Sequence, residues 1–270
     1  MSGDFDDATV RTLNALTSDF YAREAASFSA TRQAPWQGWV RALSLISETD
    51  PHFATRPLNV LDLGCGNLRF ERFLSERVRG PLSVCAVDNC PPLVEGASGR
   101  PSALPPEEDF SLSFHQIDLV DRLLERTLRD ALPTGTGDLA VAFGVMHHLP
   151  RLDLRAQMLA CLGRSLRPGG FAIISFWQFL DDPRLAAKAE HTTAEGRIAC
   201  DLPPFGPRDA LLPWQHAKGV YRFCHHCNDE EIDQLIATAQ LEAPLTELAR
   251  FSADGKSGTL NRYLVLQCAL

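Results

Sequence analysis

The chain has 270 residues, of which 45% are hydrophobic and 22% are charged, and its formal net charge is −8. These totals indicate one soluble globular domain and disfavour non-specific binding to nucleic acid or an anionic membrane. No apolar run reaches the roughly 18–20 residues that span a bilayer, and the acidic N-terminus is unlike a secretory signal. We therefore expect a cytoplasmic protein whose eight cysteines are reduced thiols.

Two helices are predicted before the first strand. Residues 8–30 place Leu13, Leu16 and Phe20 at helical spacing. Pro35 then begins a second helix over residues 36–47. A nucleotide-binding core does not require two such helices, so we predict that residues 8–50 cap a ligand cleft.

A strand that runs into a glycine turn is the central feature of the sequence. Residues 58–63 form an apolar run typical of a buried parallel strand, and Asp62 lies near its carboxyl end, where open α/β sheets bind ligands. Gly64 and Gly66 follow, and they let the backbone turn sharply and approach a ligand closely. A helix is predicted directly after the turn, so its N-terminus would point at that ligand.

The next two predicted strands end in acids. Residues 81–88 end at Asp88, whose separation from the glycine turn is typical of the residue that binds a ribose diol. Residues 110–119 include Asp118, which suits recognition of an adenine amino group. Asp118 is also placed to cap a helix predicted over residues 119–130. Residues 96–109 are predicted to form a surface loop.

The fourth strand and its exit are predicted at residues 137–150. Gly144 lets this segment pass close to a ligand, and His147 and His148 follow it. An amphipathic helix over residues 152–167 is then expected, ended by the Arg-Pro-Gly-Gly sequence.

The fifth strand, residues 171–177, completes an alternation of strands and helices that predicts a doubly wound α/β sheet. Residues 178–226 interrupt it with proline-rich, loop-like sequence, which we interpret as an insertion that forms a substrate lid. A last helix at residues 229–240 precedes two antiparallel strands, at 245–251 and 259–268.

The glycine turn differs from the dinucleotide-binding pattern, since Arg69 stands at the third glycine of Gly-x-Gly-x-x-Gly. The sequence Asp-Leu-Gly-Cys-Gly-Asn, the two strand-end acids and Arg-Pro-Gly-Gly instead resemble class I S-adenosylmethionine-dependent methyltransferases. The resemblance implies one domain over residues 1–270, a mostly parallel seven-stranded sheet with its last strand antiparallel, and S-adenosylmethionine as the cofactor. The residues then expected to bind the cofactor are Arg32, Asp62, Gly64, Cys65, Gly66, Asn67, Asp88, Asn89, Asp118, Leu119 and Gly144.

From about residue 20 to the C-terminus, the chain is similar to one subfamily, which methylates the carboxymethyl group of a modified uridine at the tRNA wobble position. That subfamily includes the methyltransferase domain attached to an AlkB-like oxygenase. The motifs that carry the similarity are Thr31-Arg32 with Pro35-Trp36, the pair His147-His148, Leu212-Pro213-Trp214, and Arg222-Phe223-Cys224-His225. The chain departs from the subfamily at Leu68, where a glycine is usual, and at Phe223 and Cys224, where tyrosines are usual.

The resemblance implies tRNA as the acceptor and a small activator subunit as a partner. Residues 179–226, however, carry six basic and six acidic side chains, and this balance favours a small carboxylate substrate instead. A non-catalytic scaffold that binds adenosylmethionine is a third interpretation. No metal is expected, because the adjacent side chains of Cys224-His225-His226-Cys227 lack the spacing of zinc ligands.

The candidate catalytic residues lie outside the glycine turn. Arg222 is expected to grip a substrate carboxylate through two parallel hydrogen bonds. One of His147 and His148 is expected to hydrogen-bond the substrate; in the alternative, one is structural and the other packs on the cofactor. Arg32 is expected to reach the cofactor's carboxylate or the substrate. The ring of Trp214 is expected either to stack on a base of the substrate or to pack in the hydrophobic core. The full set of catalytic candidates is Arg222, His147, His148, Trp214 and His225.

Overall fold

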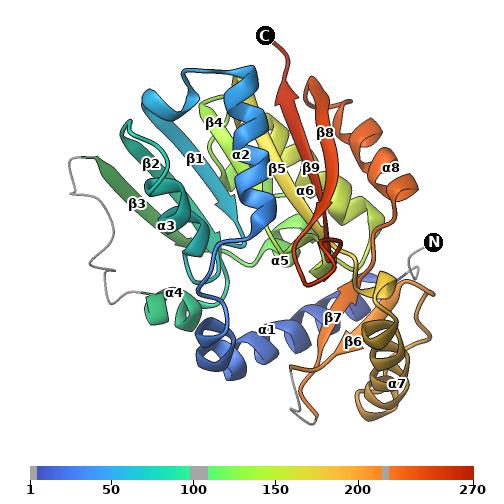
Figure 1. Cartoon of the computed structure of the whole chain (residues 1–270). Helices are drawn as coiled ribbons and strands as arrows, with labels where there is room; N and C mark the ends of the chain where they lie inside the picture. Colours follow the sequence, from blue (N-terminus) through green and yellow to red (C-terminus); the bar gives the residue numbers. More distant parts are fainter. Residues whose placement is uncertain (1–4, 98–108, 215–218) are drawn as a thin grey trace.

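A seven-stranded sheet forms the centre of the protein in its computed structural model, which describes residues 5–97, 109–214 and 219–270 (Figure 1). The strand order is β3-β2-β1-β4-β5-β9-β8. Strands β1 to β5 pair in parallel, whereas β9 is antiparallel to both of its neighbours, as predicted. The strands are β1 (Leu58–Leu63), β2 (Leu82–Asp88), β3 (Phe110–Gln116), β4 (Gly137–Ala142), β5 (Leu166–Trp177), β8 (Leu245–Ala253) and β9 (Asn261–Cys268).

Helices cover both faces of the sheet. On one face, Trp39 and Ile46 of α2 and Phe73 of α3 pack with β-strand residues such as Val141. On the other face, α5, α6 and α8 form a second apolar layer. Because both faces are covered, every residue of β4 is buried and its burial does not alternate. The helices are α2 (Gln37–Thr49), α3 (Arg69–Ser75), α5 (Leu119–Leu124), α6 (Leu152–Ser165) and α8 (Asp229–Ala239).

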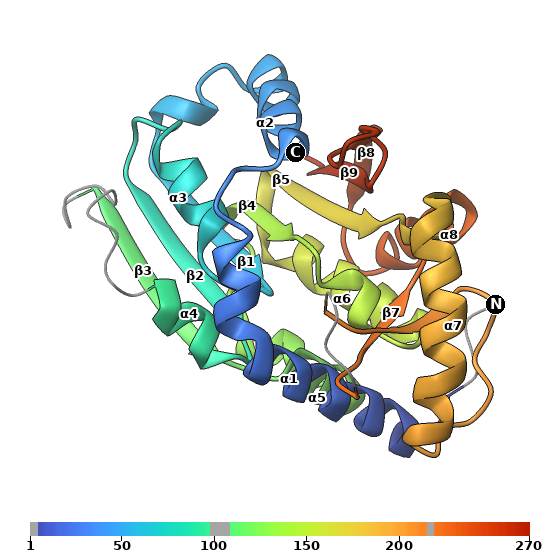
Figure 2. The same cartoon turned by 60° about the horizontal axis from the view of Figure 1, so that its bottom comes forward.

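The first helix, α1 (Asp7–Ala30), lies across the carboxyl ends of the parallel strands (Figure 2). Asp6 begins it by accepting a hydrogen bond from the Thr9 backbone N–H. Along its length α1 contacts α4 (Pro91–Ala97), α5 and the insertion strand β7. Ligand sites of open α/β sheets form at this edge, so α1 is positioned to wall one of them.

The insertion is more regular than its sequence indicated. Within residues 178–226 the structure contains helix α7 (Pro183–Ala199) and an antiparallel pair, β6 (Asp209–Leu212) with β7 (Arg222–His225). The loop-like prediction was therefore wrong for these parts. Pro183 begins the helix instead of breaking it, because it lies in the first turn after Asp182, whose side chain caps the helix.

Several element boundaries also differ from those predicted. Helix α5 ends at Leu124 rather than near residue 130, since Arg126 takes a left-handed φ of 58°. Strand β3 ends at Gln116, and β5 begins at Leu166, so Arg-Pro-Gly-Gly belongs to the strand. Residues 98–108 of the predicted surface loop lie outside the described residues. Within the described parts of the chain, none of the helices is both long and apolar enough to cross a membrane.

Candidate active site

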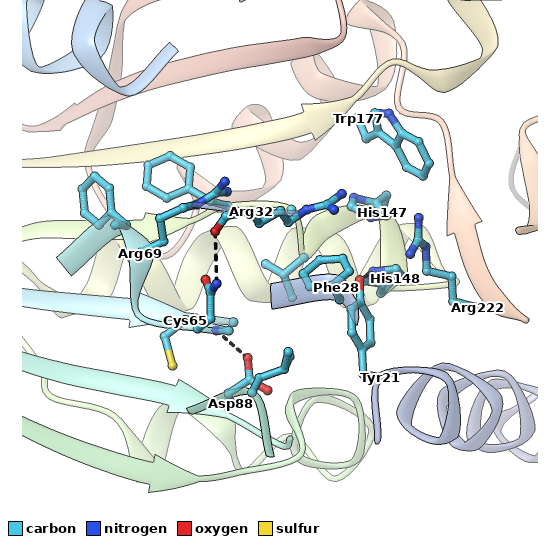
Figure 3. A pocket seen from close by; sticks show the side chains of 18 of the residues that line it. Tyr21, Phe28, Arg32, Cys65, Arg69, Asp88, His147, His148, Trp177 and Arg222 are labelled. Atoms are coloured by element: carbon cyan, nitrogen blue, oxygen red, sulfur yellow. Dashed lines mark hydrogen bonds between the residues drawn. The ribbon is translucent and has the colours of Figure 1, made fainter. Parts of the chain in front are cut away.

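A cavity of about 540 Å³ opens where the glycine turn, α1 and the insertion meet. Figure 3 shows Cys65 and Asp88 toward one end of this cavity and Trp177 and Arg222 toward the other. We call these the turn end and the hairpin end. The predicted site residues that line it are Arg32, Asp62, Gly64, Cys65, Gly66, Asn67, Asp88, Asn89, Asp118, Leu119, Gly144, His147, His148 and Arg222.

The glycine turn has a left-handed backbone at three positions. Gly64 has φ 82° and Gly66 has φ 54°, and a Cβ added to Gly64 would come within 2.9 Å of Val145 Cβ. Leu68, where the resembling subfamily usually has glycine, keeps the same left-handed conformation with φ 54°. A non-glycine residue pays roughly 1–2 kcal/mol for this, so strain is retained where the turn meets α3.

Asp88 closes the turn from the neighbouring strand. Its carboxylate accepts hydrogen bonds from the backbone N–H of Gly66 at 2.9 Å and of Cys90 at 2.9 Å. Burial raises the pKa of Asp88, although these backbone bonds oppose the shift. The carboxylate is thereby fixed against the turn and faces the cavity, where a diol of a bound ligand would be within reach.

Asp118 connects the third strand with two other elements. One of its oxygens caps α5 by accepting from the Asp121 backbone N–H at 3.1 Å, which confirms the capping role. The other accepts from Asn14 at 2.8 Å and from Asn89 at 3.1 Å. Asn14 belongs to α1, so the cap helix is joined directly to the turn end of the cavity.

The turn end fits a nucleoside ligand that carries a positive charge. Asp62 is 2% exposed, and its Oδ1 atom finds no hydrogen-bond donor among the described residues. A buried carboxylate without a donor is costly, and a ligand ammonium group would supply one. A Cβ placed on Gly66 would meet no atom within 4 Å, so space lies beside the turn. These residues therefore suit adenosylmethionine.

A parallel sheet with this strand order, a glycine turn after β1 and acids at the ends of β1 and β2 define the class I S-adenosylmethionine-dependent methyltransferases. The chain belongs to the family described as a methyltransferase domain, which matches residues 28–243. It is therefore an S-adenosylmethionine-dependent methyltransferase.

Known proteins resemble the chain in sequence or in fold. The mouse tRNA (carboxymethyluridine(34)-5-O)-methyltransferase ALKBH8 is 27% identical over 161 residues, which are 58% of this chain but only 19% of that protein. The fold is similar to 1,6-didemethyltoxoflavin-N1-methyltransferase of Burkholderia thailandensis, with TM-score 0.61 and 17% identity over 100% of this chain and 94% of that one. It is also similar to magnesium protoporphyrin IX methyltransferase of Synechocystis PCC 6803, with TM-score 0.59 and 14% identity over 95% and 100% of the chains. Both solved structures contain S-adenosylhomocysteine.

The hairpin end of the cavity is built around Arg222 of β7. Its side chain is 5% exposed, and its guanidinium lies 4.6 Å from the ring centre of Phe20 and 5.4 Å from that of Trp177. The Nε and Nη1 atoms find no acceptor among the described residues. A buried guanidinium with unused donors is a ready partner for an anionic group.

Arg32 brings a second cation toward Arg222. Its guanidinium lies 4.0 Å from the ring centre of Phe28 and 4.9 Å from that of Trp214. Burial lowers the pKa of Arg32 to about 10, so it remains charged at neutral pH. The Arg32 carbonyl accepts a hydrogen bond from Asn67 Nδ2 at 3.2 Å, which ties this segment to the glycine turn.

The two histidines are neutral at neutral pH. His148 Nδ1 lies 2.7 Å from the Phe223 carbonyl, which only accepts, so Nδ1 carries the proton and Nε2 accepts from the Tyr21 hydroxyl at 2.9 Å. Burial, with the charge of Arg222, lowers the pKa of His148 to about 3. Burial and the neighbouring His148 also lower the pKa of His147 well below its usual value. Neither ring is a strong base.

Two predicted catalytic residues do not line the cavity. His225 is fully buried, and its ring nitrogens are held by Asp209 at 2.5 Å and Glu231 at 2.9 Å. The structure therefore places it in a buried ion-pair network, and contact with an acceptor does not fit this geometry. Trp214 lies at the rim, where its Nε1 donates to Ser27 Oγ at 2.8 Å and its ring stacks with Arg32.

Several residues that line the cavity are not among those predicted from the sequence. Asn14 and Tyr21 of α1 donate to Asp118 and His148, and Trp177 makes an edge contact with His147 at 5.3 Å between ring centres. The polar residues of α1 at positions 14, 18 and 21 follow the spacing of one helix face. This spacing on the cap helix is the sequence signal that could have indicated these residues.

Asp88→Asn is expected to weaken binding of S-adenosylhomocysteine by about 10- to 100-fold. The change removes one charged acceptor and one of the bonds that shape the turn, and hydrogen bonds to charged groups contribute about 1.5–3 kcal/mol each. Isothermal titration calorimetry measures the affinity. Asp109→Asn, at an exposed position next to β3, is the matched control. Unchanged affinity of Asp88→Asn would show that this carboxylate does not contact the ligand.

Proposed function

We propose that the protein transfers a methyl group from S-adenosylmethionine to a carboxylate oxygen of its acceptor. The observation that carries this proposal is the buried Arg222 guanidinium, which has unused donors at the hairpin end of the cavity. When bound, the cofactor supplies an electrophilic methyl group on a sulfonium, and a carboxylate oxygen attacks the methyl carbon as the sulfur–carbon bond breaks. Arg222 would hold the acceptor carboxylate so that one oxygen is aimed at that methyl group.

The absence of a strong base at the hairpin end supports the same acceptor chemistry. Among the described residues that line the cavity, the carboxylates are Asp62, Asp88, Asp118 and Asp254. The first three lie at the strand ends near the turn, and Asp254 accepts bonds from Tyr263, Asn261 and Gly38. The neutral histidines are weak bases. A carboxylate acceptor needs none, because it is already ionised at neutral pH.

The leading acceptor is a tRNA wobble uridine that carries a carboxymethyl group. The similarity to the mouse tRNA (carboxymethyluridine(34)-5-O)-methyltransferase supports this choice. A cytoplasmic location and a small activator subunit are further parts of the proposal, and they rest on the subfamily resemblance alone. The second candidate is a small carboxylic acid. The net charge of −8 favours it, because RNA binding draws on phosphate neutralisation by basic side chains.

Methyl transfer from radiolabelled S-adenosylmethionine tests both candidates. We expect label on tRNA that carries carboxymethyluridine, and we expect mild alkali to release it, because methyl esters hydrolyse where N-methyl and C-methyl groups do not. A panel of small carboxylic acids is assayed in parallel. Labelled acids with unlabelled tRNA would overturn the leading acceptor, and alkali-stable label on any acceptor would overturn carboxylate methylation.

A further inference from the structure

A second buried acid, Glu71, is a neighbour of Asp62, and it has no part in the proposed methyl transfer. Glu71 is in the first turn of α3, yet its side chain is only 1% exposed. Neither of its carboxyl oxygens finds a hydrogen-bond donor among the described residues, and the same holds for Asp62 Oδ1. The two carboxyl groups are neighbours that act on each other directly. One shared proton would join an oxygen of Asp62 to an oxygen of Glu71 in a hydrogen bond, and it would leave only one of the two groups charged.

The surroundings favour retention of this proton. Burial and the charge of Glu71 raise the pKa of Asp62 well above its usual value, and burial raises the pKa of Glu71 to about 7. The carboxylate of Asp88, from β2, acts in the same direction on both. Hydrogen bonding with Asp62 and with the backbone N–H of Glu71 itself, together with the charge of Arg72, partly opposes the rise in the pKa of Glu71. The thiol of Cys65, in the turn, is kept neutral because burial and these acids raise its pKa.

A cationic ligand at Asp62 would stabilise the ionised carboxylate and so favour release of the shared proton. Asp62 lines the cavity beside Gly64, whereas Glu71 does not. An ammonium group that reaches Asp62 donates hydrogen bonds to it and stabilises its charged form. Adenosylmethionine and adenosylhomocysteine both carry such a group, and 5′-methylthioadenosine, which has the same nucleoside, does not.

We propose that Asp62 and Glu71 form a proton-releasing pair, in which Glu71 is a positioning residue that makes cofactor binding pH-dependent. In the free protein the pair shares a proton between two carboxyl oxygens. When the ligand ammonium binds, the O–H bond breaks, the proton leaves to solvent, and the carboxylate of Asp62 pairs with the ammonium. This inference concerns cofactor binding alone, so it stands or falls independently of the acceptor.

The linkage fixes the sign of the pH dependence. If binding releases a proton, affinity for the cofactor rises with pH through the region near 7 where the free pair is protonated, by up to about tenfold per pH unit. At higher pH the free pair has already lost its proton, so the dependence levels off. Glu71→Gln places an amide donor beside Asp62, so Asp62 stays ionised and no proton remains to be released.

Calorimetric titration at pH 7 in phosphate and in Tris buffer measures the released proton, because these buffers differ in ionisation enthalpy. For the wild-type protein we expect S-adenosylhomocysteine to release roughly half to one proton and 5′-methylthioadenosine to release almost none. Glu71→Gln should bind S-adenosylhomocysteine without the release. Glu76→Gln, a change at an exposed acid at the end of α3, should behave like the wild type.

Two results would overturn the proposal. Equal proton release by both ligands would place the proton at a group that faces the shared nucleoside, such as Asp88. If Glu71→Gln released as much proton as the wild type on binding S-adenosylhomocysteine, Glu71 would not be the source of the pH dependence. The comparison of the two ligands needs no variant, so it remains decisive if Glu71→Gln does not fold. If S-adenosylhomocysteine does not bind at all, the assignment of adenosylmethionine as the cofactor fails. That outcome differs from binding without proton release, which would contradict only the Asp62–Glu71 pair.

Discussion

Arg222→Ala is expected to lower kcat/KM for the acceptor by at least about 100-fold. Two charge-assisted hydrogen bonds to a carboxylate contribute about 1.5–3 kcal/mol each, and 1.4 kcal/mol corresponds to a factor of ten. The substituted site also loses the geometry that aims the acceptor oxygen at the methyl group. Initial rates of radiolabelled methyl transfer, measured at several acceptor concentrations, give kcat and KM separately.

Three companion measurements separate the carboxylate grip from a general defect. Arg222→Lys keeps the charge but not the paired donors, so it should recover only part of the lost rate. Arg184→Ala, at an 85% exposed arginine of α7, should leave the rate unchanged. S-Adenosylhomocysteine should bind Arg222→Ala with wild-type affinity, because Arg222 lies at the other end of the cavity. Undiminished turnover by Arg222→Ala would end the carboxylate proposal.

Arg155→Met is expected to lower the free energy of unfolding by about 3–5 kcal/mol, the range found when one partner of a buried ion pair is removed. Arg155 is fully buried and donates to Glu231 at 2.7 Å and to the Leu149 carbonyl at 2.5 Å. Methionine has a similar length but supplies neither donor. The Leu149 carbonyl, one residue after His148, would be left without this bond. Urea unfolding monitored by fluorescence and circular dichroism measures the change.

The pH dependence of this effect has a defined sign. Burial alone would raise the pKa of Glu231, but the hydrogen bond from His225 and the charges of Arg155 and Arg208 lower it to about 2. The stabilisation is therefore present above the usual pKa of 4.5 and is lost as the pH falls toward 2. The difference between the wild type and Arg155→Met should shrink over that interval. Arg129→Met, at an exposed arginine, is the control, and it should change stability by less than about 1 kcal/mol. An equal loss in the control would contradict a special role for the buried network.

The sheet and the turn could be predicted because their signals are local. Strand β1 is bounded as predicted, since its apolar run ends at two glycines. Asp88 and Asp118 follow their strands at the same edge of a parallel sheet, so the topology alone brings them to one cavity. The antiparallel β9 was expected only from the resemblance to the methyltransferases, and the structure confirms it.

The hairpin end could not be predicted in the same way, because it depends on contacts between distant segments. His225 and Arg222 are three residues apart in one short strand, yet one is held in a buried network and the other lines the cavity. Strand alternation places the two side chains on opposite faces of β7. Which face meets the cavity depends on packing against α1 and α8, and the local sequence does not specify that packing. The prolines of the insertion led to a wrong prediction of loop structure for another reason. Pro183 lies in the first turn of helix α7, where proline is favourable.

The hydrogen bonds between α1 and the insertion limit how the choice of methyl acceptor can be transferred from one related methyltransferase to another. Thr17 Oγ1 accepts from the Phe223 backbone N–H at 3.1 Å, and Ser27 accepts from Trp214. Tyr21 is joined to the insertion indirectly, because it donates to His148, whose Nδ1 donates to the Phe223 carbonyl. A chimera that exchanges residues 178–226 alone would place foreign side chains against an unmatched α1. Grafts intended to change the substrate should therefore transplant residues 7–36 and 178–226 together, as two halves of one recognition module.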